Sequence, residues 1–343
     1  MACSTPFLNA SEAARQLGVS TKALRLYEQR GLLTPERTLA GYRTYGPEMM
    51  ARAAAIVALR ALGLSVAQVS RVLEGDPQSL EPALAAHEAT LHAEIRRLVN
   101  TIDKVQRLRA DLARGQAPAD GELARLLNPS AGFNVSFELP WPWGGERFET
   151  GEIRPLNYII GPLGSGKTRL AMRLAEKLPN ATFLGLERIK DGTAATRLEA
   201  DTALKSRVAP TLAWLIDEGA VESEALTALL VGLEAEGPDV LVVDLVEQGL
   251  DQATQEALIV HLRQRARLGA RPLFLMTRSS AILDLAAIGP DESVILCPAN
   301  HSPPTRVAPF PGSPGYEAVA TCLASPEVRA RTAGMIAWRP QAA

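Results

Sequence analysis

The feature that most constrains the fold is a glycine-rich stretch of eight residues, Gly161–Thr168, which reads GPLGSGKT. An apolar run of strand type precedes it, and the helical pattern RLAMRLAEKL follows it. Glycines at such a strand-to-helix junction let backbone N–H groups close on a phosphate, while Lys167 neutralises phosphate oxygens and Thr168 is placed to hold Mg²⁺. The pattern predicts an α/β domain with a bound nucleotide at this turn.

The spacing Gly-x-x-x-x-Gly-Lys-Thr is that of a complete P-loop. A second apolar strand, 239–244, ends in the carboxylate of Asp244, which is a Walker B pattern that places Asp244 to hold Mg²⁺ through water. A third strand, 272–276, ends just before Thr277 and Arg278. These elements indicate a parallel sheet with nucleotide ligands at the ends of its strands.

Residues 133–300 resemble ABC-type ATPases, because Leu250-Asp251 also matches the run that follows Walker B in that family. The resemblance implies ATP and Mg²⁺ as cofactors. It places Arg278 at the position of the switch histidine, where a basic residue could touch the γ-phosphate. Trp141 and Trp143 fall where the family carries an adenine-stacking aromatic, with covering of the sheet edge as the alternative. The implied nucleotide-binding residues are Gly161, Gly164, Ser165, Gly166, Lys167, Thr168, Asp244, Trp143 and Arg278, with Thr168 and Asp244 on the metal.

The sequence departs from that family in ways that bear on catalysis. Leu245 stands where the catalytic Glu directly follows the Walker B Asp, and a leucine has no group to orient or deprotonate water. At most a weak ATPase is therefore expected, with Glu247 as the candidate substitute base. The stretch 219–230 has no signature glycine pair, and only 77 residues separate Lys167 from Asp244, so the helical subdomain must be reduced.

The N-terminal region has residues typical of the starts and ends of short helices. Ser11 is a cap for a helix ending at Leu17, and Ser20 or Thr21 is a cap for a second helix ending before Gly31. Pro35 and the Ala40-Gly41 turn predict a β-hairpin wing, Pro47 starts a third helix, and Ser65-x-x-Gln68 has capping-box spacing for a fourth. These elements have the proportions of a winged helix-turn-helix.

The stretch SEAARQLGVSTKALRLYEQRGLLTPERTLAGYRTYGPE resembles the DNA-binding domain of MerR-type transcription regulators over about residues 8–75. The resemblance places the second helix in the major groove and the wing on the flanking backbone. Packing in the head core is the alternative for Tyr27 and Tyr45, and Glu28 is expected to pair with Arg25 or Arg43. Leu26 replaces a frequent second tyrosine, so one phosphate contact is in doubt. The implied DNA-binding residues are Ser20, Thr21, Lys22, Arg25, Tyr27, Arg37, Tyr42, Arg43 and Tyr45.

Residues 80–114 predict one long helix with a heptad seam, and a two-stranded coiled coil, with packing on its own chain as the alternative. The seam consists of Leu84, Leu91, Ile95, Leu98, Ile102, Val105 and Leu112. In MerR-like proteins this helix pairs antiparallel and spaces two heads on a pseudo-palindromic operator. No cysteine lies between Cys3 and Cys297, which speaks against metal sensing.

Composition and sequence patterns speak against a membrane, secreted or disulfide-rich protein. The chain carries no apolar run long enough for a membrane span, no secretory signal pattern and too few cysteines for a disulfide framework. Residues 1–115 hold 15 Lys and Arg against 11 Asp and Glu, while the remainder is acidic. A basic N-terminal region beside an acidic remainder fits DNA binding by the N-terminal region. A cytoplasmic, bacterial, nucleoid-associated protein is expected.

We therefore expect a multi-domain protein. An all-α winged helix-turn-helix head with a small β wing (1–78) is followed by the antiparallel coiled-coil dimerisation helix (79–114), a linker containing one short helix (115–132) and a degenerate ABC-like α/β P-loop NTPase domain (133–343).

The expected function is a homodimeric, sequence-specific transcription regulator whose Mg·ATP-binding domain modulates promoter distortion. Its expected partners are double-stranded promoter DNA and RNA polymerase. The alternatives are a P-loop ATPase or phosphotransferase targeted to DNA by the head, and a DNA-architecture or defence factor assembled by ATP.

Overall fold

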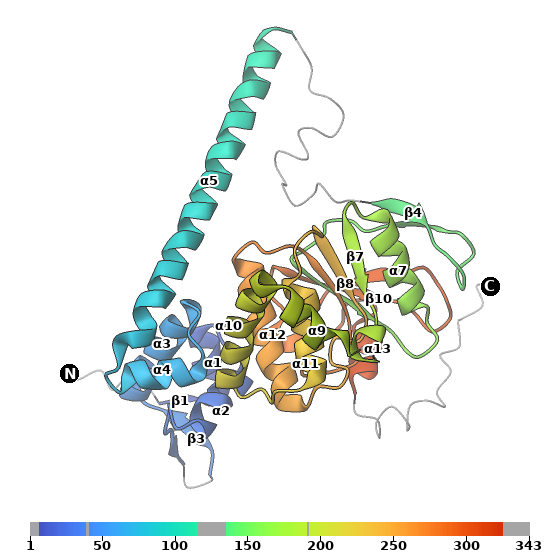
Figure 1. Cartoon of the computed structure of the whole chain (residues 1–343). Coiled ribbons are helices and arrows are strands. Elements are labelled where there is room, and N and C mark those ends of the chain that lie inside the picture. Colours follow the sequence, from blue (N-terminus) through green and yellow to red (C-terminus); the bar gives the residue numbers. More distant parts are fainter. Residues whose placement is uncertain (1–6, 39–40, 116–134, 191, 325–343) are drawn as a thin grey trace. The chain divides into compact units, whose positions relative to one another are not determined.

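A computed structural model describes the chain except for residues 1–6, 39–40, 116–134, 191 and 325–343 (Figure 1). The expected linker, apart from residue 115, therefore lies outside the described residues. The chain divides into two compact units. The first is Met1–Leu126 together with Ala213–Gly219, and the second is Leu127–Leu212 together with Ala220–Ala343.

The first unit begins with a small head of short helices and strands. Its elements are β1 (Leu8–Asn9), α1 (Ala10–Leu17), α2 (Thr21–Gln29), β2 (Glu36–Arg37), β3 (Arg43–Tyr45), α3 (Pro47–Ala61) and α4 (Val66–Leu73). The three strands form an antiparallel sheet in the order β1-β3-β2. This is the winged helix-turn-helix arrangement that the sequence predicts.

Side-chain caps set the helix boundaries of the head. Asn9, not Ser11, caps α1: its side chain accepts from the N–H groups of Ser11 and Glu12, and Glu12 completes a capping box. Ser20 caps α2, and the box formed by Ser65 and Gln68 starts α4 as expected. The expected first cap was wrong because the helix starts earlier, and Asn is as good a cap as Ser.

The head has its own apolar core. Leu24 and Tyr27 of α2, Tyr45 of β3 and Ile56 of α3 are all buried in one cluster. The wing and the helices therefore share one packed interior, which holds α2 in a fixed orientation.

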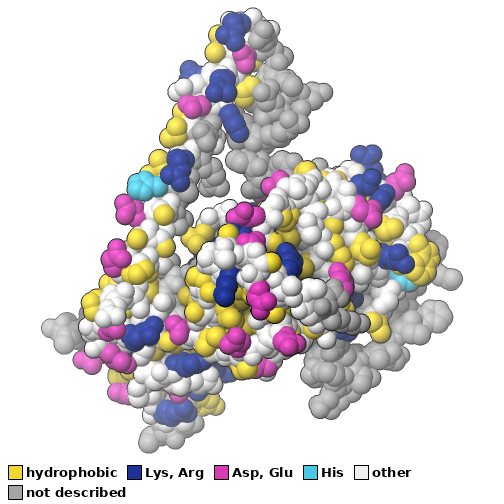
Figure 2. Space-filling model, in the orientation of Figure 1, with side chains coloured by type: hydrophobic (Ala, Val, Ile, Leu, Met, Phe, Trp, Pro, Cys, Tyr) yellow, Lys and Arg dark blue, Asp and Glu magenta, His cyan; other side chains and the backbone are white. Residues whose placement is uncertain are grey.

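The long helix predicted from residues 80–114 is α5 (Leu80–Ala113), which follows the 3₁₀ turn η1 (Pro77–Ser79). All seven seam residues are exposed in the single chain, and Figure 2 shows hydrophobic side chains along this helix. An exposed apolar stripe is unfavourable in water. The seam is therefore available for pairing, although pairing itself stays a prediction.

The second unit is built on a six-stranded sheet in the order β11-β10-β6-β9-β8-β7. All its strand pairs are parallel except β10–β11. A separate antiparallel pair is formed by β4 (Ser136–Glu138) and β5 (Arg147–Glu149). The strands of the large sheet are β6 (Leu156–Ile160), β7 (Ala181–Leu184), β8 (Val240–Val243), β9 (Leu273–Met276), β10 (Glu292–Leu296) and β11 (Thr305–Val307).

Helices connect these strands, as parallel pairing requires. The connecting elements are α7 (Lys167–Lys177), α8 (Glu187–Lys190), α9 (Thr193–Ala200), α10 (Thr202–Glu218), α11 (Glu224–Glu234), α12 (Gln252–Arg267) and the 3₁₀ turn η3 (Leu285–Ala287). Helix α13 (Tyr316–Leu323) follows the last strand, β11. Apolar residues of α7 pack with alternate residues of β8 and β9, such as Val242 and Phe274, in one buried cluster. The carboxyl ends of β6, β8 and β9 thus meet at one edge of a buried sheet.

Candidate functional site

The glycine-rich loop, residues 161–166, joins β6 to α7 and borders a cavity of about 370 Å³ in the second unit. No side chain caps the N-terminus of α7, so the first N–H groups of that helix are open to an anion. The loop is a strand-to-helix junction, as the sequence predicts. The cavity is lined by Trp141, Pro142, Leu163, Gly164, Gly166, Lys167, Thr168, Arg169, Leu186, Asp244, Leu245, Met276 and Arg278.

Two polar side chains of this region are buried within it. The Lys167 Nζ donates to the carbonyl oxygens of Gly161 and Pro162, each at 2.7 Å, and burial lowers the pKa of Lys167. The Ser165 Oγ is buried and has no hydrogen-bond partner among the described residues. A buried ammonium and an orphaned hydroxyl beside open N–H groups fit a phosphate-bearing ligand.

Asp244 follows β8 and lines the same cavity. Burial raises the pKa of Asp244, and the nearby charges of Arg188 and Lys167 oppose that rise. A carboxylate that faces an ammonium and the exposed Thr168 hydroxyl in one cavity fits a Mg²⁺-bound phosphate. The described residues contain no group of three or more His, Cys, Asp or Glu side chains that could hold a metal by themselves. A metal here would therefore come with its ligand.

Arg188, at the start of α8, supports two residues of this site, Asp244 and Leu245, and no sequence pattern singled it out. Its Nη1 donates to the carbonyl oxygens of Gly185 and Asp244 at 2.8 Å each, and its Nη2 donates to that of Leu245 at 2.9 Å. The guanidinium thus ties the loop after β7 to the loop after β8. An arginine shortly after an apolar strand is common, so the sequence held no signal for this role.

Beyond Asp244, the loop after β8 contributes no carboxylate to the lining of the cavity. Leu245 lines it with its backbone at φ 38°, in the left-handed region. Glu247 is not among the lining residues, and its Oε1 instead accepts from the Arg278 N–H at 2.9 Å. Glu247 therefore holds the loop after β9, while Arg278 lines the cavity.

The two tryptophans before the loop have different surroundings. Trp143 is 5% exposed, belongs to the core cluster and donates from Nε1 to the Ser302 carbonyl at 3.1 Å. Trp141 is 76% exposed and lines the cavity. The structure therefore brings Trp141, rather than Trp143, to the place where a base could stack.

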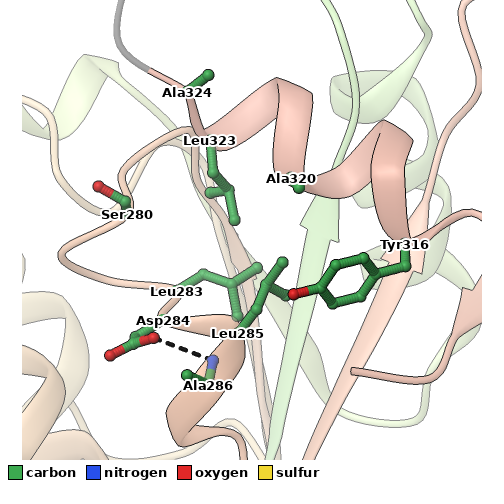
Figure 3. A pocket seen from close by; sticks show the side chains of 9 residues that line it. All are labelled: Ser280, Leu283, Asp284, Leu285, Ala286, Tyr316, Ala320, Leu323 and Ala324. Atoms are coloured by element: carbon green, nitrogen blue, oxygen red, sulfur yellow. Dashed lines mark hydrogen bonds between the residues drawn. The ribbon is translucent and has the colours of Figure 1, made fainter. Parts of the chain in front are cut away.

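A second hollow of about 340 Å³ lies between η3 and α13 in the same unit (Figure 3). Leucine side chains and the Tyr316 ring line it, and the Asp284 carboxylate at its edge accepts from the Ala286 N–H at 3.0 Å. No residue of the sequence-predicted site lies there.

In the first unit, α2 presents a polar face to solvent. Thr21, Lys22 and Arg25 are exposed on it, and Ser20 is half-buried because it caps the helix. Tyr42 at the wing is 74% exposed. These residues form a surface on which arginine, lysine and hydroxyl groups could meet a DNA backbone and base edges.

The remaining predicted DNA-binding residues divide between ion pairs and the core. Glu28 accepts hydrogen bonds from both Arg37 and Arg43, which fixes the wing to α2. Tyr27 and Tyr45 are buried in the head core, and burial raises the pKa of both. The structure thus favours the packing alternative for the two tyrosines and brings Arg37 and Arg43 together through Glu28.

Within the described part of the chain, no helix combines the length and apolar character that a membrane span requires.

Comparison with known proteins identifies the head. Residues 8–76 match the family model described as MerR HTH family regulatory protein. The chain is 37% identical over 106 residues to a protein of Haemophilus influenzae named "Probable heavy metal-dependent transcriptional regulator". The matched region covers 29% of this chain and 83% of that relative. The chain is also 36% identical over 112 residues to the transcriptional regulator BrlR of Pseudomonas aeruginosa, covering 31% of this chain and 42% of that protein.

Among solved structures, a MerR family regulator that lacks the sensor domain and is bound to promoter DNA matches 32% of this chain and 92% of its own. The sequence identity is 20% and the TM-score is 0.25. This chain covers 83% of the length of the first of these curated relatives and 42% of the second. The chain belongs to the MerR family of helix-turn-helix regulators.

Proposed function

We propose that the chain is a promoter-binding transcription regulator whose second unit binds Mg·ATP and thereby changes how two paired heads hold the promoter. The head carries the DNA-binding part of this proposal. The cavity in which Lys167, Thr168 and Asp244 meet carries the nucleotide part.

Family membership and the exposed face of α2 support the DNA-binding role. Arg25 and Lys22 supply positive charge on a helix whose hydroxyl neighbours can also contact phosphate. The exposed seam of α5 supports pairing of two copies, because a coiled coil would bury it.

The surroundings of the glycine-rich loop support nucleotide binding. Open N–H groups at α7, the buried Lys167 ammonium and the orphaned Ser165 hydroxyl all favour a polyphosphate. Bound Mg·ATP would bring the metal, which Thr168 and Asp244 would hold, and the exposed Trp141 ring could stack on the base.

The same cavity favours binding over turnover. Leu245 lines it where a base would be needed, and Glu247 is engaged with the Arg278 backbone. A long-lived bound state suits a sensor. Deforming promoter DNA costs a few kcal/mol, and nucleotide can supply that only through different affinities for the two states of the protein.

The experiment pairs nucleotide binding with promoter binding. Lys167→Ala is compared with Lys177→Ala, which removes an exposed ammonium from the other end of α7. A fluorescent ATP analogue should bind wild type and Lys177→Ala alike, and bind Lys167→Ala at least about tenfold more weakly, because a charge-assisted contact is worth about 1.5–3 kcal/mol. Fluorescence anisotropy of a labelled promoter duplex should then show a Mg·ATP-dependent shift that Lys167→Ala lacks.

Equal nucleotide binding by wild type and Lys167→Ala would refute the nucleotide part of the proposal. If nucleotide binds but both promoter isotherms ignore it, the second unit performs separate chemistry, and phosphate release becomes the measurement to make. For the head, Arg25→Ala should weaken promoter binding by about 1–3 kcal/mol, whereas Arg107→Ala, an exposed arginine of α5, should leave it unchanged.

A further inference from the structure

The C-terminal end of α10 belongs to the first unit. Ala213–Gly219 clusters with the head, although the residues on both sides of it along the chain belong to the second unit. We call this segment the α10 end. Its sequence, AWLIDEG, carries an indole and two carboxylates. None of these residues took part in the sequence-predicted site.

Glu218 is the buried carboxylate of the α10 end, with a side chain only 1% exposed. Arg60 of α3 donates to both its oxygens, from Nη1 to Oε1 at 2.6 Å and from Nη2 to Oε2 at 2.9 Å. The Val66 N–H, at the start of α4, also donates to Oε1 at 2.6 Å. A bidentate, buried arginine–carboxylate pair is among the strong polar contacts in proteins, so the α10 end is fixed at the turn between α3 and α4.

Further contacts link the same segment to the neighbouring helix ends. The Trp214 Nε1 donates to the Gly63 carbonyl at 2.9 Å, and the Arg60 guanidinium lies 5.7 Å from the centre of the Trp214 ring. Arg30 closes α2 and donates to the Glu218 carbonyl at 3.1 Å. The α10 end therefore contacts the C-terminus of α2, the helix whose exposed face we assign to DNA.

Helix α10 contains a proline just before this segment. Pro210 lies in its interior, three residues before Ala213. A proline there removes one hydrogen bond of the helical ladder and is a common cause of kinks. The α10 end could therefore change its angle to the rest of the helix without the helix unfolding.

We propose that the α10 end is an intramolecular latch through which the nucleotide state of the second unit controls the helix-turn-helix, an inference that rests on the function proposed above. Residues of the second unit precede and follow the α10 end in the chain, so a rearrangement there acts on this segment through the backbone, and on α2 and α4 through the hydrogen bonds of Arg30 and Val66 to Glu218. Withdrawal of Glu218 would leave Arg60 largely buried without its carboxylate, which is strongly unfavourable. That cost opposes partly released positions, so we expect the α10 end to be either fully bound to the head or fully released, which is what a switch requires.

The test uses the full chain with Glu218→Gln, and Glu222→Gln as the matched control, because Glu222 is exposed four residues further on. In wild type and Glu222→Gln, Mg·ATP should change promoter affinity about fivefold or more, the usual lower range for coupled sites. In Glu218→Gln the change should fall below about twofold, within the spread expected of uncoupled sites. The affinity for the fluorescent ATP analogue should be unaltered in all three.

A second measurement needs no variant and covers the case in which Glu218→Gln unfolds the head. Hydrogen exchange of the wild-type chain should change on addition of Mg·ATP at the Val66 amide and in the α10 end, and should not change in Lys167→Ala. If wild type binds neither nucleotide nor promoter, the proposed function fails. If Mg·ATP shifts promoter affinity while exchange at these sites is unaltered, or while a folded Glu218→Gln responds fully, the latch is overturned.

Discussion

Two glycines of the loop after β6 give a matched pair of substitutions. Gly166 has φ 88° and Gly164 has φ 79°, so an alanine at either position adopts a left-handed backbone. A Cβ on Gly166 would lie 2.6 Å from Cη2 of Trp143, whereas a Cβ on Gly164 would meet nothing within 4 Å. The two changes therefore share the backbone strain and differ in the steric contact.

The magnitudes follow from these geometries. The left-handed backbone costs about 1–2 kcal/mol for each alanine. The clash adds about 1–3 kcal/mol at Gly166, because the Trp143 ring is 5% exposed and its Nε1 is bound to the Ser302 carbonyl. Gly164→Ala should thus lower the free energy of unfolding of the second unit by about 1–2 kcal/mol, and Gly166→Ala by about 2–5 kcal/mol.

Urea unfolding followed by tryptophan fluorescence and by circular dichroism measures this difference, with both probes needed because two units can unfold separately. Trp143→Leu completes a double-mutant cycle: in its background, most of the extra loss caused by Gly166→Ala should disappear, and the contact of the new Cβ with Pro142 Cδ at 3.1 Å remains. Equal losses for Gly164→Ala and Gly166→Ala would refute the reasoning, since they would show that the Trp143 ring moves aside freely.

Three further expectations concern buried groups of the second unit. Arg188→Met should cost about 1–3 kcal/mol of stability, because the Asp244 carbonyl oxygen loses the guanidinium that donates to it, while those of Gly185 and Leu245 keep one backbone donor each. Arg188→Lys should not restore the lost stability, and full stability of either variant in urea titrations would contradict the role assigned to the guanidinium fork. Burial and the Arg265 charge lower the pKa of His261 from 6.5 to about 4. Between pH 6.5 and 4 the His261 side chain is therefore protonated in the unfolded chain and neutral in the folded one. The free energy of unfolding should fall by at most about 3 kcal/mol as the pH drops from 6.5 to 4. In urea titrations at several pH values, His261→Gln should reduce this dependence of stability on pH. An unchanged pH dependence would contradict the role assigned to His261. Burial raises the pKa of Cys297 to about 12, so iodoacetamide should label it more slowly than the less buried Cys322, as read by mass spectrometry; equal rates would show that the site opens.

Local sequence patterns predicted much of the fold. The capping box at Ser65 and the glycine-rich junction before α7 each depend on a few neighbouring residues, so a short stretch of sequence is enough to predict their structure. The heptad seam of α5 is likewise a periodic, local signal. The Ser11 cap was misassigned within the same kind of window, because Asn9 competes with it only two residues away.

Contacts between distant parts of the chain decided the rest. Whether Trp141 or Trp143 meets the cavity depends on packing against α7 and the loop at Ser302, and two tryptophans with one residue between them give no such signal. Arg188 gains its role only because the sheet order brings the loops after β7 and β8 together. Glu218 meets Arg60 across 158 residues of chain.

The sequence by itself determined the helix-turn-helix head, the long helix and the strand–loop–helix that brings Lys167 and Thr168 to one turn, because each follows from periodicity, capping and glycine placement over short distances. Only the tertiary structure decided which side chains face the cavity, which pair with each other and which disappear into the core. Those outcomes depend on burial and on the order of strands in the sheet, and the energy of a buried polar group is set by neighbours that lie far away in sequence.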